Sequence, residues 1–198
     1  EIRSLSGTKG LVLMGLILTD DQIILRDMAR SFFDEKSPVA RMRALRDTED
    51  ATGFSQELWQ EMGQLGWIGI PFPEEVGGSG LGAAEIGVLL SEAGRVLAPE
   101  PFVSTILMGG NAVLLGGKES LRKQLLPGVC EGKRILCLAL QEHGRFSPYA
   151  VETSATTAGD GFVLNGSKQF VLDGHVAEQI VVVARTSGAS GDRDGLSL

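Results

Sequence analysis

In the first two thirds of the chain, apolar residues recur every three or four positions, as they do on the buried face of a helix. Thr19 and Gln22 have the spacing of a capping box and open the first such stretch. Its apolar residues are Ile24, Leu25, Met28, Phe32 and Phe33. The pattern predicts a helix that ends before Pro38, because proline cannot continue the helical hydrogen bonding.

Two more helices follow from the same periodicity. Ser55 is a typical N-cap for a second helix, which Gly66 ends. A glycine-rich linker then leads to a long amphipathic helix, which ends before Pro99 and Pro101. The apolar positions of this long helix are Ile86, Leu89, Leu90, Ala93 and Leu97.

Two further helices complete the predicted bundle. An apolar helix covers residues 102–115, and a short helix covers residues 118–126, where Pro127 and Gly128 close it. Residues 16–128 therefore indicate a bundle of about five helices without an internal repeat.

The periodicity changes after Gly132. Short apolar and β-branched runs predict strands over residues 135–140, 152–157, 162–164, 168–172 and 179–185. The dipeptides Asp160-Gly161 and Asn165-Gly166 are typical of two-residue hairpin turns. The pattern predicts an antiparallel β-meander from about residue 134, and residues 196–198 begin another strand.

The predicted fold class is α+β, with an N-terminal all-α helical bundle followed by a partial antiparallel β domain. We expect the helical domain over residues 16–132 and the β domain over residues 133–198. Because the last residues begin a strand, the β domain is expected to be incomplete in this chain.

Residues 1–15 are left out of the fold prediction. The apolar run 10–18 is far shorter than the roughly 20 residues that span a bilayer. Arg3 and Lys9 before it suit a signal peptide, and Met14 with the following glycine suits myristoylation. No small-residue cleavage site follows, however, and Met14 is internal. We expect residues 1–15 to be a tag-like or upstream segment.

Composition narrows the function further. The chain has 198 residues, 43% of them hydrophobic, which is enough for a sizeable core. Its net charge of −7 argues against a nucleic-acid surface, which needs basic clusters. We expect neither a nucleic acid nor a membrane as partner.

Cys130 and Cys137 lack zinc-ligand spacing and suggest free thiols in a reducing cytosol, so the predicted location is cytoplasmic.

The glycine-rich segment 77–82 precedes a helix and invites comparison with phosphate-binding loops. It lacks the Gly-Lys-Ser/Thr ending of a P-loop, and Gly80, Gly82 and Glu85 do not match the dinucleotide fingerprint. A permissive helix-entry loop is therefore the favoured interpretation, and phosphate binding is the alternative.

The polar loop that follows the first predicted strand carries the candidate chemistry. His143, Arg145 and Ser147 in this loop offer donors for an anionic ligand. The carboxylates that can act as general bases, if a pocket desolvates them, are Glu142, Glu152 and Asp173. Neither His143 nor His175 has another histidine or a cysteine three or four positions away, so no metal site is predicted.

Five segments, in order along the chain, resemble the acyl-CoA dehydrogenase family. They read LTDDQ with FFDE at the end of its helix, LGWIGIPFPEEVGGSGLG, EAGRVLAP, LLPGVCEGKRILCLALQE and DGFVLNGSKQFVLDG. The second, residues 65–82, is the most specific of the five. The resemblance covers residues 16–198 and corresponds to the first half of the family.

The resemblance implies a helical domain, a β domain and a second helical domain, of which the last is absent from this chain. It implies FAD against the β domain and the α,β-dehydrogenation of an acyl-CoA thioester to the trans-2-enoyl-CoA. It also implies an acyl-CoA substrate, an electron-transfer flavoprotein as electron acceptor, and a homo- or hetero-oligomer. The family's catalytic carboxylate is expected beyond Leu198, so no catalytic residue is assigned here.

The family's binding residues are carried over position by position. The implied FAD contacts are Leu140, Gln141, Ser147, Phe170, Val171 and Leu172, and the implied substrate contacts are Arg145 and Ser147. Gln141 and Leu172 each stand where the family has threonine, and the second threonine hydrogen-bonds the flavin. These departures resemble the divergent subunits of heteromeric bacterial members. A non-catalytic scaffold subunit that binds FAD weakly is therefore the second hypothesis.

Overall fold

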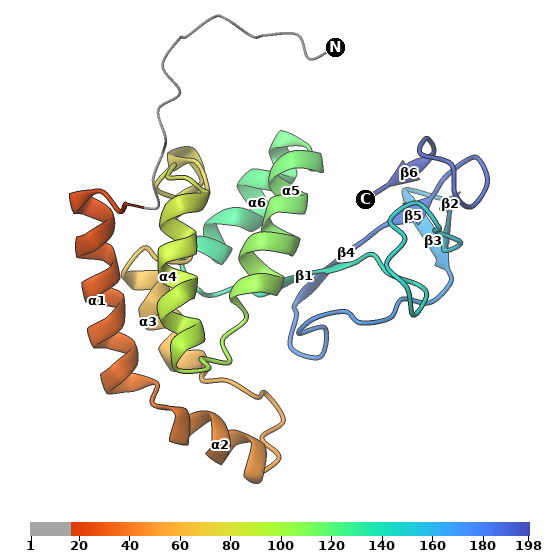
Figure 1. The fold of residues 1–198 in the computed structure, drawn as a ribbon. Helices are drawn as coiled ribbons and strands as arrows, with labels where there is room; N and C mark the ends of the chain where they lie inside the picture. Colours follow the sequence, from red (N-terminus) through yellow and green to blue (C-terminus); the bar gives the residue numbers. More distant parts are fainter. Residues whose placement is uncertain (1–16) are drawn as a thin grey trace, which may run out of the picture.

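The computed structural model describes residues 17–198, so the prediction for residues 1–15 lies outside the described residues. Helices form the first part of the chain and short strands the second (Figure 1). The helical elements are α1 (Asp20–Lys36), α2 (Val39–Asp47), α3 (Gln56–Gln64), the 3-10 helix η1 (Glu74–Val76), α4 (Ala83–Arg95), the π-helix η2 (Val103–Gly110), α5 (Asn111–Gly116) and α6 (Glu119–Cys130). The strands are β1 (Leu136–Ala139), β2 (Ser154–Ala158), β3 (Gly161–Asn165), β4 (Gln179–Val182), β5 (Ala184–Arg185) and β6 (Leu196–Ser197). The predicted α+β fold class is confirmed.

The local start signals place two helices as predicted. The Thr19 hydroxyl accepts from the Gln22 amide at 3.3 Å, and the Gln22 side chain accepts from the Thr19 amide at 3.1 Å. The Ser55 hydroxyl accepts from the Leu58 amide at 3.2 Å. These bonds satisfy N–H groups that have no partner within their helices, which fixes where α1 and α3 begin.

Two helical features differ from the prediction. No helix is predicted from the sequence over α2, whose nine residues include none that is buried and whose apolar positions, Val39, Met42 and Leu45, are only half-buried. The prediction that Pro127 closes the last helix of the bundle was wrong, because α6 continues to Cys130. Val129 and Cys130 are buried, so their packing outweighs the hydrogen bond that proline removes. Gly132, with φ +68°, follows the true end.

An aromatic cluster forms the centre of the helical core. Phe33 from α1, Trp59 from α3 and Phe102 before η2 are almost completely buried, as is Trp67 in the loop after α3. The rings of Trp59 and Phe102 meet edge to face with centroids 5.1 Å apart. Burying one such side chain contributes about 1.5–3 kcal/mol, so this cluster anchors α1, α3 and the start of η2 together.

The strands form two sheets rather than one meander. β1 and β4 pair in parallel, and the second sheet has the order β3-β2-β5-β6 (Figure 1). The hairpin of β2 and β3 is antiparallel, as predicted, and so is the pair of β5 and β6. The two-residue turn of the β2–β3 hairpin is Gly159-Asp160 rather than Asp160-Gly161, because Ala158 pairs with Gly161.

The predicted strand over residues 168–172 was wrong, and Asn165-Gly166 is not a hairpin turn. Residues 166–178 form an irregular loop in which Phe170 and Asp173 have positive φ of 54°, outside the β region. The predicted strand over residues 179–185 is divided in two. Its first half pairs with β1, and the Arg185 amide then bonds to the Thr153 carbonyl beside β2.

β1 connects the helical core to the second sheet. Leu136, Cys137 and Ala139 are buried, and the strand passes so close to η2 that Gly109 has no room for a side chain. A Cβ at Gly109 would lie 2.8 Å from the carbonyl carbon of Leu136. None of the helices in residues 17–198 is long and apolar enough to cross a membrane.

Replacing Gly109 with alanine tests this close approach. We expect Gly109→Ala to lower the free energy of unfolding by about 1–3 kcal/mol, because the new methyl group forces β1 away from η2. Gly87→Ala in α4 is the matched control, since no atom lies within 4 Å of its Cβ position. That control should be neutral or stabilising by about 0.5–1 kcal/mol. Urea unfolding measures both, and equal effects would contradict the contact.

Candidate functional site

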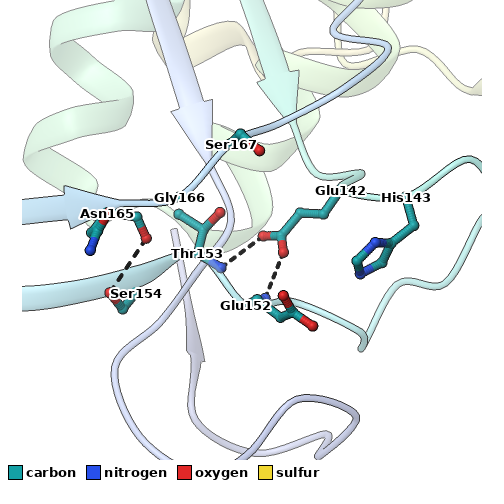
Figure 2. A pocket seen from close by; sticks show the side chains of 8 residues that line it. All are labelled: Glu142, His143, Glu152, Thr153, Ser154, Asn165, Gly166 and Ser167. Atoms are coloured by element: carbon teal, nitrogen blue, oxygen red, sulfur yellow. Dashed lines mark hydrogen bonds between the residues drawn. The ribbon is translucent and has the colours of Figure 1, made fainter.

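Three backbone segments meet where β1 ends. They enclose an open cavity of about 450 Å³ with an almost entirely polar lining (Figure 2). The residues that line it are Glu142, His143, Glu152, Thr153, Ser154, Asn165, Gly166 and Ser167. Glu142 and His143 come from the loop after β1, and the others come from the start of β2 and the end of β3.

Among the residues that line this cavity, Glu142 has the side chain with the most hydrogen bonds. Its side chain is 5% exposed, and its carboxylate accepts from the amides of Glu152 at 2.6 Å and Thr153 at 3.0 Å. It also pairs with Lys168 at 2.6 Å. Burial opposes its ionisation, but the hydrogen bonds from Lys168 and from these residues outweigh burial and lower the pKa of Glu142 to about 2.

Lys168 joins the third segment to the first. Its side chain is 8% exposed, and its ammonium group donates to the Leu140 carbonyl at 3.2 Å as well as to Glu142. The next residue, Gln169, donates its amide to the Gln141 carbonyl at 2.7 Å. These bonds bring residues 140–142 and 168–169 side by side, although no sheet ladder connects them.

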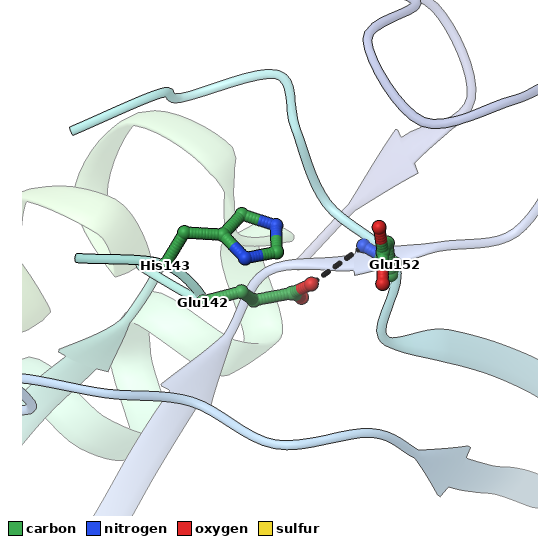
Figure 3. A group of neighbouring side chains, drawn as sticks. All are labelled: Glu142, His143 and Glu152. Carbon is green, nitrogen blue, oxygen red and sulfur yellow. Dashed lines mark hydrogen bonds between the residues drawn. The ribbon is translucent and has the colours of Figure 1, made fainter. Parts of the chain in front are cut away.

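Glu142, His143 and Glu152 offer ligand atoms that all lie within 4.8 Å of one another (Figure 3). A cation at this position would compete with Lys168 and with two amides for the same carboxylate. We therefore assign no metal to the cluster. With a pKa near 2, Glu142 is also a weak base, which removes it from the general-base candidates.

The residues with implied FAD contacts lie in two adjacent stretches. Leu140, Gln141 and Val171 are half-buried, whereas Phe170 is 70% exposed and Leu172 is 48% exposed. Within residues 17–198, the amides of Gln141, Val171 and Leu172 donate no hydrogen bond. An exposed aromatic ring beside free amides fits a flat, polar-edged ring system such as an isoalloxazine.

The implied substrate residues lie farther along the loop. Arg145 and Ser147 are both exposed and do not line the cavity around Glu142. The structure therefore does not bring them together with the cavity residues. The general-base candidate Asp173 accepts from the buried hydroxyl of Ser104 in η2 at 2.5 Å, and His175 is exposed beside the Thr52 carbonyl.

The glycine-rich segment has the structure of a helix-entry loop. The amides of Ser79, Gly80 and Leu81 donate to carbonyls of residues 69–72, so they are occupied. The Gly82 amide donates to Glu85 at the start of α4. Phosphate binding would need such amides to be free, so the structure favours the entry-loop interpretation.

The cysteines fit the prediction of free thiols. Cys130 and Cys137 are both buried and unbridged. Burial raises the pKa of the Cys130 thiol to about 11 and also raises the pKa of Cys137. Both thiols are therefore unreactive near neutral pH.

Sequence reasoning missed two residues that organise this region, Lys168 and Arg185. The Arg185 guanidinium is buried and donates five hydrogen bonds, all to backbone carbonyls. It connects residues 149–151 with residues 187–194. The sequence signal for Arg185 is a single basic residue at the end of an apolar run, whereas the pattern around Lys168 predicts a strand.

Comparison with known proteins agrees with this fold. Residues 19–133 match the family model "Acyl-CoA dehydrogenase, N-terminal domain". Benzylmalonyl-CoA dehydrogenase of Aromatoleum aromaticum is 31% identical over 93% of this chain, which spans 48% of that protein. The structure titled as an electron transferring flavoprotein of Acidaminococcus fermentans is 29% identical, with a TM-score of 0.77 over 88% of this chain and 46% of that one. The ChsE4–ChsE5 complex of Mycobacterium tuberculosis is 26% identical, with a TM-score of 0.76 over 91% of this chain and 50% of that one.

The chain belongs to the acyl-CoA dehydrogenase family, because the family model covers more than half of it. It spans about half the length of the curated relatives that it matches. Members of this family are FAD-dependent oxidoreductases, and the resemblance on which the family was first inferred is confirmed.

The lowered pKa of Glu142 predicts an acid-dependent loss of stability. Its folded pKa of about 2 lies below the ordinary value of 4.5, so the carboxylate stabilises the fold above pH 4.5 and loses this effect as the pH falls toward 2. The unfolding free energy of Glu142→Gln should lie below that of the unsubstituted protein by on the order of 3 kcal/mol near neutral pH. By about pH 3 this gap should shrink by about 2 kcal/mol.

Urea unfolding at the two pH values measures this gap. Glu152→Gln is the control, because Glu152 is an exposed carboxylate of the same cavity whose side chain does not pair with Lys168. A gap for Glu142→Gln that stays constant with pH would show that its carboxylate is not ionised in this network.

Proposed function

We propose that this chain supplies the flavin-contacting part of an FAD-dependent acyl-CoA dehydrogenase. The proposed reaction converts an acyl-CoA thioester to the trans-2-enoyl-CoA. One observation carries the proposal: the Gln169 amide bonds to the Gln141 carbonyl at 2.7 Å and brings the two implied flavin segments together. These segments are almost thirty residues apart in sequence and share no strand pairing.

Four of the implied residues offer a ring or a free backbone amide that suits flavin binding. The ring of Phe170 is exposed and can cover one face of the isoalloxazine, and the free amides of Gln141, Val171 and Leu172 can donate to its polar edge. The flavin, when bound, supplies the acceptor for the hydride that leaves the acyl chain. The chain's own residues bind and orient it and keep water from its covered face.

The backbone of Phe170 has a strained conformation of the kind that is frequent at binding sites. Its φ of +54° is unfavourable for a residue with a Cβ, and its ring is largely exposed to solvent. Strained residues persist where neighbouring contacts over-determine them, and they are frequent at binding sites. Lys168 and Asp173 on either side are both held by buried partners.

The polar residues Arg145 and Ser147 are proposed to contact phosphate groups of the cofactor or the acyl-CoA. Both are exposed on a loop and offer hydrogen-bond donors. The catalytic carboxylate is proposed to lie outside residues 1–198. An electron-transfer flavoprotein is the proposed electron acceptor, and a homo- or hetero-oligomer in the cytoplasm is the proposed form.

A scaffold subunit that binds FAD weakly is the second candidate function. Leu172 offers no side-chain donor, and the Gln141 side chain donates to the His143 carbonyl at 2.7 Å within its own loop. Neither side chain therefore replaces the hydroxyl donors that the family has at these positions. A related structure, the ChsE4–ChsE5 complex, is titled as a complex of two proteins.

Substitution of Phe170 tests where the flavin lies. In the full-length protein, Phe170→Asp should abolish most of the bound flavin, because a charged side chain replaces the apolar cover of the ring. Phe162→Asp on β3 is the matched control, since Phe162 is also exposed but lies outside the proposed site. The flavin absorption of the purified proteins gives the occupancy. Equal occupancy in both variants would place the flavin elsewhere.

Leu172→Thr tests whether a hydroxyl donor at position 172, where the family has threonine, strengthens FAD binding. A neutral hydrogen bond contributes roughly 0.5–1.5 kcal/mol, so a restored hydroxyl should tighten FAD binding by about fivefold. Leu164→Thr on β3 makes the same chemical change at a similarly exposed leucine and should leave the Kd unchanged. Titration of flavin-free protein with FAD measures both. No gain in Leu172→Thr would show that residue 172 does not face the flavin.

A further inference from the structure

The buried ion pair of Glu142 and Lys168 joins the loop after β1 to the start of β2 and to the loop after β3, and no strand pairing connects that first loop to the other two segments. Glu142 holds the start of β2 through the amides of Glu152 and Thr153. Lys168 holds the end of the β1 segment through the Leu140 carbonyl. The salt bridge at 2.6 Å closes the network between them.

Burial distinguishes this pair from the surface ion pairs of the same residue types. The side chains of Glu142 and Lys168 are 5% and 8% exposed, whereas those of Glu119 and Lys123 on α6 are 78% and 61% exposed. A buried pair contributes little net stability after desolvation, but each partner requires the other in place. Such a pair therefore specifies one arrangement of its segments.

The positions of the pair in the sequence are as informative as its geometry. Leu140 and Gln141 directly precede Glu142, and residues 170–172 follow Lys168 after one intervening residue. Each stretch that faces the proposed flavin is therefore adjacent in sequence to one residue of the ion pair: residues 140–141 to Glu142, and residues 170–172 to Lys168. A shift of the pair would change the separation of the two stretches.

We propose that Glu142 and Lys168 are positioning residues that set the separation of segments 140–141 and 170–172 before the flavin binds. This inference rests on the proposed function, since the segments matter only if a flavin lies against them. The network is directional, because the carboxylate accepts from two amides and the ammonium donates to a carbonyl. The role therefore requires these two chemical groups at these two positions.

A neutral double variant tests the role without leaving an unpaired buried charge. Glu142→Gln/Lys168→Met removes both charges and the bond to the Leu140 carbonyl while approximately conserving side-chain volume. Glu119→Gln/Lys123→Met makes the same changes at the exposed pair on α6. FAD titration of flavin-free full-length protein gives the Kd, and visible circular dichroism of bound flavin reports its surroundings. Urea unfolding shows whether each variant is folded.

The proposal predicts that the Glu142/Lys168 double variant is folded, binds FAD at least tenfold more weakly than the unsubstituted protein, and alters the flavin dichroism. The control should differ from the unsubstituted protein by less than twofold in Kd. A folded double variant with unchanged Kd and unchanged dichroism would overturn the positioning role while leaving the proposed function intact.

A milder variant keeps the test decisive if the double variant does not fold. Glu142→Gln retains an oxygen for one amide and leaves Lys168 beside Leu140, so its Kd for FAD should rise about threefold or more. An unchanged Kd in Glu142→Gln would overturn the role. Unsubstituted protein without measurable FAD affinity would instead overturn the proposed function, and the positioning role with it.

Discussion

The site depends on the close packing of β1 against η2. Gly109 lets the backbone of Leu136 and Cys137 approach to a distance that any side chain at this position would prevent. β4 pairs with the same strand in parallel, so β1 is held by the helical core and by its sheet partner. Its last residue is therefore fixed in space, and the polar loop that follows starts from a rigid position.

The Glu142–Lys168 pair extends this rigidity into a region without regular structure. Residues 166–178 have no strand pairing, yet both sides of Phe170 are tied to buried groups through Lys168 and Asp173. The ring of Phe170 is nevertheless exposed, and its backbone is strained. A rigid support beneath an exposed, strained aromatic residue is the arrangement that a preorganised binding site requires.

Local signals predicted the fold wherever local chemistry decides it. Thr19 and Ser55 cap their helices through bonds three residues away, so their effect can be read from the sequence. Pro127 predicted the end of α6 too early, because the burial of Val129 and Cys130 outweighs the hydrogen bond that proline removes. The run 168–172 resembled a strand, but Lys168 binds Glu142, 26 positions away. The family motif indicates both segments of the proposed site, whereas a long-range ion pair between them leaves no local pattern.

Hydrogen exchange with and without FAD tests the central claim, that residues 139–147 and 168–174 together form the flavin-contacting surface. The account predicts that saturating FAD slows amide exchange in peptides covering both segments and leaves exchange in α1, α3 and α4 unchanged. Slower exchange confined to the glycine-rich segment 77–82, or no change in the two segments, would contradict it.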